Sequence, residues 1–164
     1  MADNSIFKED IFAGKKVFIT GGATGMGLGF AKAFLNHGAE VIIASRKKDN
    51  LILASKEAEK DTGEKLLWKI MDVRDNESVE KVADFIKNEW GHLDILVNNA
   101  AGNFISPAAS MSENAWRAVV DIVLDGTFRV SKACYPILRN SKSGSSIVNI
   151  IANYAWNAAP FVAH

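Results

Sequence analysis

The feature that most constrains the fold is a glycine-rich stretch at residues 20–27, which reads Thr-Gly-Gly-Ala-Thr-Gly-Met-Gly. A short apolar run precedes this stretch and a helical pattern follows it. Strand, glycine turn and helix in this order favour an anion site, because the helix N-terminus presents free N–H groups and a positive dipole. Gly21 can take the tight turn, Gly25 lets the backbone approach a phosphate, and Gly27 lets the helix pack closely on the strand. The stretch therefore predicts a nucleotide-binding turn, with an ordinary glycine-rich turn as the alternative.

Apolar strand patterns and helical patterns alternate along the rest of the chain. The predicted strands are residues 15–20, 40–44, 65–71, 93–97 and 145–151. The predicted helices are residues 26–36, 49–61, 75–90 and 112–139. Most strands are continuous apolar runs, which indicates a sheet covered on both faces. We predict an α/β fold with a doubly wound parallel sheet, a Rossmann fold, whose ligand lies at the carboxyl ends of the strands.

Composition excludes several classes of protein. The 164 residues are enough for about one domain, which we expect over residues 15–164 after an N-terminal arm at residues 1–14. The net charge is zero, so nothing favours a nucleic acid or an anionic membrane as partner. The single cysteine, Cys134, excludes an internal disulfide and a cysteine-rich zinc site. The polar start lacks the pattern of a signal peptide and no apolar run is long enough to span a membrane, so we expect a cytoplasmic protein.

The end of the second predicted strand indicates which dinucleotide would bind. An NAD site usually has an acidic residue there to hold the ribose 2′-hydroxyl. This chain has Ser45, Arg46 and Lys47 instead. A guanidinium can grip a 2′-phosphate as a planar fork, and a lysine adds a point charge. We therefore predict NADP(H); the alternative is that these cations are solvated charges at a helix start, where they would oppose the helix dipole.

Two further motifs follow the third and fourth strands. Asp72 and Val73 follow the third strand, and Asn-Asn-Ala-Ala-Gly follows the fourth at residues 98–102. Together with the Thr-Gly-x-x-x-Gly-x-Gly spacing, these motifs resemble the short-chain dehydrogenase/reductase family from Lys15 onward. The resemblance implies that Asp72 and Val73 contact the adenine, although Asp72 alone could simply begin a turn. The cofactor-binding residues expected on all these grounds are Gly21, Thr24, Gly25, Met26, Gly27, Ser45, Arg46, Lys47, Asp72, Val73, Asn98, Ala100 and Gly102.

One branch of the family is more similar still. The loop at residues 98–107, with residues 43–47, 71–74 and 121–124, resembles the 2,4-dienoyl-CoA reductases. The resemblance implies reduction of polyunsaturated fatty acyl-CoA thioesters by NADPH in the auxiliary arm of β-oxidation. It also implies that Asn103, Phe104 and Ile105 line the acyl pocket, although Phe104 and Ile105 could instead pack beneath their loop.

The same resemblance suggests the catalytic groups. Negative charge collects on the thioester oxygen during this reduction, so a hydrogen-bond donor is needed there. Dienoyl reductases place a tyrosine just after the fifth strand, where this chain has Tyr154; the alternative is a rim aromatic residue. Asp125 occupies a position where the branch usually has asparagine. An ionised carboxylate only accepts hydrogen bonds, so Asp125 could help only if protonated, or through water or a lysine.

The chain ends at His164, before the helix that carries the family's lysine, so we expect a continuation. A trans-2-enoyl thioester reductase and a 3-oxoacyl or carbonyl reductase of the same family are rival functions. A truncated chain that binds NADP without turnover is a rival of another class. The predicted helix at 112–139 contains Gly126, is expected to bend near Pro136, and has a second apolar side. That side is consistent with the dimers and tetramers of the family.

Overall fold

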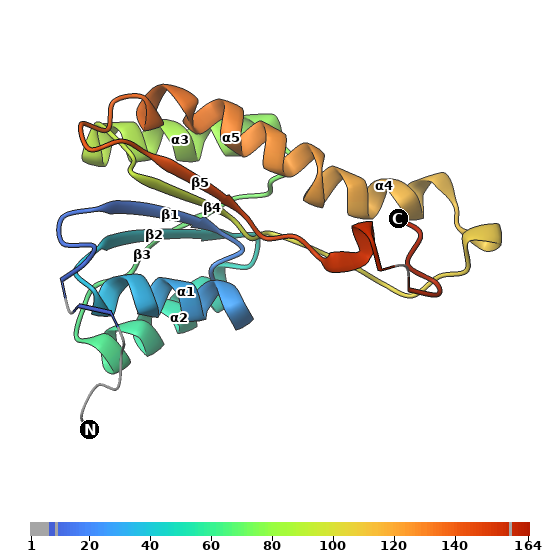
Figure 1. The fold of residues 1–164 in the computed structure, drawn as a ribbon, viewed down its shortest axis with the longest axis horizontal. Helices are drawn as coiled ribbons and strands as arrows, with labels where there is room; N and C mark the ends of the chain where they lie inside the picture. Colours follow the sequence, from blue (N-terminus) through green and yellow to red (C-terminus); the bar gives the residue numbers. More distant parts are fainter. Residues whose placement is uncertain (1–6, 9, 158) are drawn as a thin grey trace.

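The computed structural model describes residues 7–8, 10–157 and 159–164. In this part of the chain, five parallel strands form one sheet in the order β3-β2-β1-β4-β5 (Figure 1). The strands are β1 (Lys16–Thr20), β2 (Glu40–Ser45), β3 (Leu67–Ile70), β4 (Ile95–Asn98) and β5 (Ser146–Asn149). The strand order reverses between β1 and β4, which is where doubly wound sheets bind ligands. The predicted Rossmann fold is confirmed.

Helices cover both faces of the sheet. Figure 1 shows α1 and α2 on one side and α3 and α5 on the other, with α4 extending beyond the sheet. The helices are α1 (Gly25–Asn36), α2 (Lys48–Thr62), α3 (Asn76–Trp90), α4 (Glu113–Val123) and α5 (Asp125–Leu138), and the short 3-10 turns are η1 (Ala108–Ser110) and η2 (Asn153–Ala155). Helices α2 and α3 end at glycines in the left-handed conformation, Gly63 and Gly91, as their sequence predicts.

The continuous apolar run of β1 is explained by two separate cores. Side chains alternate between the faces of a strand, so Val17 and Ile19 pack toward α1 and α2. Phe18 packs on the opposite face with Ile86 of α3 and Cys134 of α5. Burial raises the pKa of the Cys134 thiol to about 12. The cysteine is therefore a core residue, as its apolar surroundings in the sequence indicate.

The prediction of one continuous helix over residues 112–139 was wrong. The single helix expected over residues 112–139 is two helices, α4 and α5, separated at Leu124. Near the break, side chains donate hydrogen bonds to backbone carbonyl groups that would accept from backbone N–H groups in a continuous helix. The Thr127 hydroxyl donates to Val123 O at 2.6 Å, and Arg129 Nη1 donates to Asp121 O at 3.3 Å. Such back-bonding bends helices. Helix α5 ends two residues after Pro136, in accordance with the expected end effect.

The N-terminal arm is described only in part, because residues 1–6 and 9 lie outside the described residues. Phe12 packs edge-on against Phe34 of α1, with ring centroids 4.9 Å apart. Gly14 takes a positive φ of 73° and its N–H donates to Gly38 O at 3.1 Å. These contacts attach the arm to the end of α1. Within the described ranges, the helices are all too short or too polar to cross a bilayer.

Candidate cofactor site

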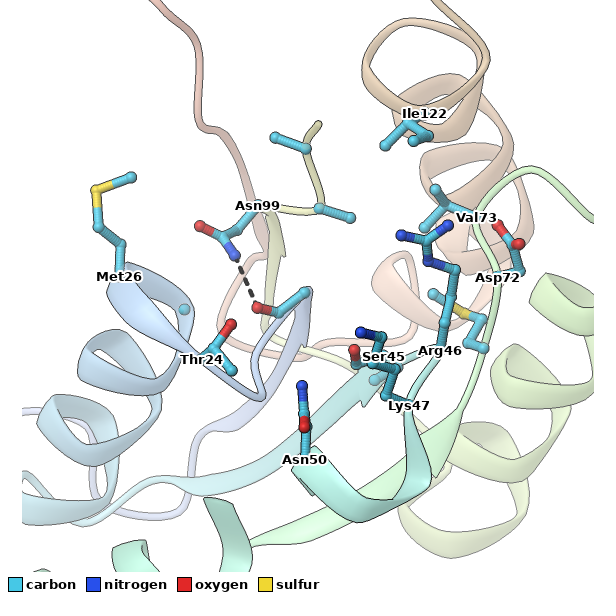
Figure 2. Close-up of a pocket in the computed structure, with 16 residues that line it drawn as sticks. Thr24, Met26, Ser45, Arg46, Lys47, Asn50, Asp72, Val73, Asn99 and Ile122 are labelled. Carbon is cyan, nitrogen blue, oxygen red and sulfur yellow. Dashed lines mark hydrogen bonds between the residues drawn. The ribbon is translucent and has the colours of Figure 1, made fainter. Parts of the chain in front are cut away.

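A cavity of about 340 Å³ opens at the carboxyl ends of β1, β2, β3 and β4 (Figure 2). The glycine turn and the start of α1 form one wall, and the loops after β3 and β4 form others. The lining residues are Gly21, Thr24, Met26, Gly27, Ala44, Ser45, Arg46, Lys47, Asn50, Met71, Asp72, Val73, Asn99, Ala100, Ala101 and Ile122. Most of the cofactor-binding residues expected from the sequence are therefore brought together. Gly25, Asn98 and Gly102 are expected residues that do not line the cavity.

The glycine turn has the geometry that its spacing requires. Gly21 adopts a positive φ of 65° and its N–H donates to Ala44 O at 2.8 Å, which joins the turn to β2. A Cβ on Gly27 would lie 2.5 Å from Gly21 O and 2.6 Å from Asn99 Nδ2. Gly27 is thus closely packed, but against the glycine turn and Asn99, whereas the sequence analysis expected the strand. A Cβ on Gly25 would meet open space, so the phosphate contact at Gly25 stays a prediction.

Asparagine side chains tie the strand ends together behind this turn. Asn99 Nδ2 donates to Thr20 O at 3.0 Å and to Gly21 O at 3.1 Å; Figure 2 shows the amide facing the turn. In return, the Thr20 hydroxyl accepts from the N–H groups of Asn99 and Ala100, both at 3.0 Å. Asn98 is buried and donates to Asn149 Oδ1 at 2.9 Å, which joins β4 to β5. Asn98 therefore joins the ends of β4 and β5 and does not line the cavity.

Cations gather at the end of β2. Ser45 is the last residue of that strand, and Arg46 and Lys47 follow it with exposed side chains. Figure 2 shows the Arg46 side chain extending toward Val73. Asn50, which the sequence analysis missed, is the third residue of α2. Side chains at the third position of a helix can reach back toward the N-cap, which is Lys47 here. This position in the sequence could have identified Asn50 as a residue of the site.

Asp72 begins a turn, as the alternative interpretation of that residue expected. Its Oδ1 accepts from the backbone N–H of Arg74 at 3.0 Å. The Arg74 guanidinium also grips the carboxylate, with Nη2 2.6 Å from Oδ2. Hydrogen bonds from the Arg74 side chain lower the pKa of Asp72, and the nearby charge of Arg46 lowers it further. Asp72 thus lines the cavity as a paired carboxylate.

Asp125 lies at the start of α5, next to the cavity wall but not in its lining. The adjacent Gly126 packs on Val73, where an added Cβ would lie 2.8 Å from the valine Cγ2. Asp125 Oδ2 lies 3.8 Å from Arg129 Nη2, and Arg129 also donates to Val73 O at 3.4 Å. The cation beside Asp125 is therefore an arginine, whereas the sequence analysis considered a lysine.

Tyr154 and the predicted acyl-pocket residues lie outside this cavity. Tyr154 belongs to η2 and is 48% exposed. The Phe104 ring stacks on His164 at 4.5 Å between centroids, and Ile105 is exposed. The N–H of Ser106 donates to Phe161 O at 2.9 Å, so this loop pairs with the segment after η2. Neither Tyr154 nor Asp125 lines the cavity, so their catalytic roles stay predictions.

Comparison with known proteins agrees with this geometry. The family model described as short chain dehydrogenase matches residues 15–164. The chain belongs to the short-chain dehydrogenase family. It is 38% identical to a peroxisomal 2,4-dienoyl-CoA reductase of Danio rerio, over 97% of this chain and 53% of that protein. It is 39% identical to a probable 2,4-dienoyl-CoA reductase of Bacillus subtilis, over 92% of this chain and 59% of that protein. The chain thus spans about half the length of the curated relatives that it matches.

Solved structures share the fold. A short chain dehydrogenase from Bacillus anthracis is 42% identical, with a TM-score of 0.79 over 90% of this chain and 61% of that one. L-sorbose reductase from Gluconobacter frateurii, solved with NADPH and L-sorbose, has a TM-score of 0.88 over 95% of this chain and 59% of that one. At 24% identity the latter shows the fold alone. These likenesses agree with the fold described above.

The close packing of Gly27 in this short-chain dehydrogenase gives a test within one helix. We expect Gly27→Ala to lower the free energy of unfolding by about 1–3 kcal/mol, because the methyl group would overlap Gly21 O and Asn99 Nδ2. Gly29→Ala is the matched control, since a Cβ there meets nothing within 4 Å. Helix propensity should make the control more stable by up to about 1 kcal/mol. Urea unfolding of both variants measures the difference, and equal effects would contradict the packing argument.

Proposed function

We propose that this chain forms the NADP(H)-binding part of an oxidoreductase that reduces 2,4-dienoyl-CoA thioesters. The observation that carries the cofactor choice is the pair of cations, Arg46 and Lys47, at the end of β2 in the cavity lining. A carboxylate at that point would repel a 2′-phosphate, whereas a guanidinium can bind it with two parallel hydrogen bonds. The relatives named 2,4-dienoyl-CoA reductase support the substrate class.

The residues of this chain would bind and orient the reactants. NADPH, when bound, would supply a hydride. The N-terminus of α1 and the glycine turn would hold the pyrophosphate, and Arg46 with Lys47 would hold the 2′-phosphate. The Tyr154 hydroxyl would donate to the thioester oxygen as the electron pair of the diene moves onto it. Delivery of a proton from solvent to a carbon of the substrate would then complete the reduction of one double bond.

The other parts of this proposal follow from the same relatives. The substrate would be an unsaturated fatty acyl-CoA, and the enzyme would serve β-oxidation. A cytoplasmic location stays a prediction, and the relatives include proteins named peroxisomal. Exposed apolar side chains along the α4–α5 segment, Leu124, Phe128 and Tyr135, support a homo-oligomer, either a dimer or a tetramer.

NADPH oxidation tests the substrate class directly. We expect the natural polypeptide that contains this chain to oxidise NADPH when a 2,4-dienoyl-CoA is added. The loss of absorbance at 340 nm, which accompanies the oxidation of this cofactor, measures the reaction. A trans-2-enoyl-CoA, a 3-oxoacyl-CoA and a simple ketone serve as competing substrates. Activity confined to one of these would replace the dienoyl reductase by the corresponding rival.

A chain that binds NADP without turnover is the second candidate. The observation that favours it is that Tyr154 is exposed and does not line the cavity. The intact mass of the purified polypeptide shows which protein was assayed. NADPH binding without oxidation of any of the four substrates, in a polypeptide of verified mass, would favour this candidate over the enzyme.

A further inference from the structure

The carboxylate of Asp72 accepts more hydrogen bonds than a turn requires. An Asx turn needs only the backbone N–H of Arg74, which lies 3.0 Å from Oδ1. In addition, Arg74 Nε donates to both carboxylate oxygens, at 3.0 and 3.1 Å, and Nη2 donates to Oδ2 at 2.6 Å. The Arg74 side chain is 42% exposed and does not line the cavity. The hydrogen bonds described for its side chain therefore all go to Asp72.

Asp72 is also the one acidic residue in the described lining of the cavity. In Figure 2, the Arg46 guanidinium and the Asp72 carboxylate lie on either side of Val73. An unpaired carboxylate there would attract Arg46 and would repel a phosphate bound to that guanidinium. The Asp72 side chain is only 27% exposed, so water screens its charge incompletely.

We propose that Arg74 is a positioning residue that sets the preference of this cavity for NADP(H) over NAD(H). By holding both oxygens of Asp72, Arg74 balances the carboxylate charge and leaves Arg46 free to bind the 2′-phosphate. This inference rests on the proposed function, because it assumes that Arg46 faces a 2′-phosphate. It adds to that function a residue that does not itself touch the cofactor.

Arg74→Gln tests the inference through the ratio of two affinities. We expect the Kd for NADPH to rise about tenfold, since the freed carboxylate competes for Arg46, while the Kd for NADH changes by less than about twofold. The double variant Arg74→Gln/Asp72→Asn should restore the Kd for NADPH to within about threefold of the wild type, because the competing charge is gone. Titration calorimetry at fixed salt, on the natural polypeptide and on both variants, measures each Kd.

Arg117→Gln is the matched control. Arg117 pairs with Asp121 at 3.7 Å, is 65% exposed and lies outside the cavity, so its loss should leave both affinities unchanged. Equal weakening of NADPH and NADH by Arg74→Gln, or no rescue by Asp72→Asn, would overturn the inference and leave the proposed cofactor intact. A wild-type protein that binds NADH at least as tightly as NADPH would overturn both.

Discussion

Replacing Tyr154 by phenylalanine is expected to lower kcat for a 2,4-dienoyl-CoA by about 100- to 1000-fold, the usual effect of removing one oxyanion donor. The hydroxyl would bind the thioester oxygen most strongly when that oxygen carries negative charge. An interaction of this kind affects kcat much more than KM. Steady-state kinetics of the natural polypeptide, with the diene varied at saturating NADPH, measures the two constants separately.

The chain offers a matched control for this experiment. Its other tyrosine, Tyr135, is 57% exposed on α5, with the Arg139 guanidinium 5.8 Å from its ring centroid. Tyr135→Phe removes the same hydroxyl and keeps the ring, so kcat should stay within about twofold of the wild type. If Tyr154→Phe behaves like this control, Tyr154 is a rim aromatic and another group stabilises the oxyanion.

Arg46→Asp is expected to raise the Kd for NADPH by about 100-fold or more. The change removes a charge-assisted fork and adds a negative charge beside the 2′-phosphate, and hydrogen bonds to charged groups contribute about 1.5–3 kcal/mol each. NADH lacks that phosphate, and an acidic residue at this point can accept from its ribose hydroxyl. The Kd for NADH should therefore stay constant or fall. Fluorescence titration with each cofactor measures the ratio.

Lys56→Asp controls for the change in net charge. Lys56 is exposed on α2 and does not line the cavity, so its reversal alters the overall field without touching the site. We expect the control to weaken both cofactors slightly and equally, through long-range electrostatics that added salt screens. If Arg46→Asp weakens the binding of NADPH and of NADH by the same factor, Arg46 does not select the cofactor. Its guanidinium is then a solvated charge at the start of a helix.

Local sequence signals were sufficient for most of the fold. The apolar runs of β1 and β2 are continuous because helices cover both faces, and Gly63 and Gly91 end their helices in the left-handed conformation. The pairing of Asp72 with Arg74 is equally local, since only Val73 separates them in the sequence. It could have been predicted from the Asp-x-Arg spacing at the end of a strand.

Features that depend on distant parts of the chain could not be predicted in the same way. Beside the break at Leu124, Arg129 donates to both Asp121 O and Val73 O, and Val73 follows a strand more than 50 residues earlier. Ile122 enters the cavity lining only because α4 approaches the end of β3. Helical periodicity contains no signal for either contact, because both depend on how separate elements pack.

The mutual bonds of Thr20 and Asn99 have a thermodynamic consequence. The glycine turn and the loop after β4 are fixed to each other by four hydrogen bonds that involve no ligand. Ordering one backbone residue costs about 1–2 kcal/mol of conformational entropy. The glycine turn and the loop after β4 are ordered when the protein folds. The entropy cost of ordering them therefore does not reduce the affinity for a ligand that enters the cavity.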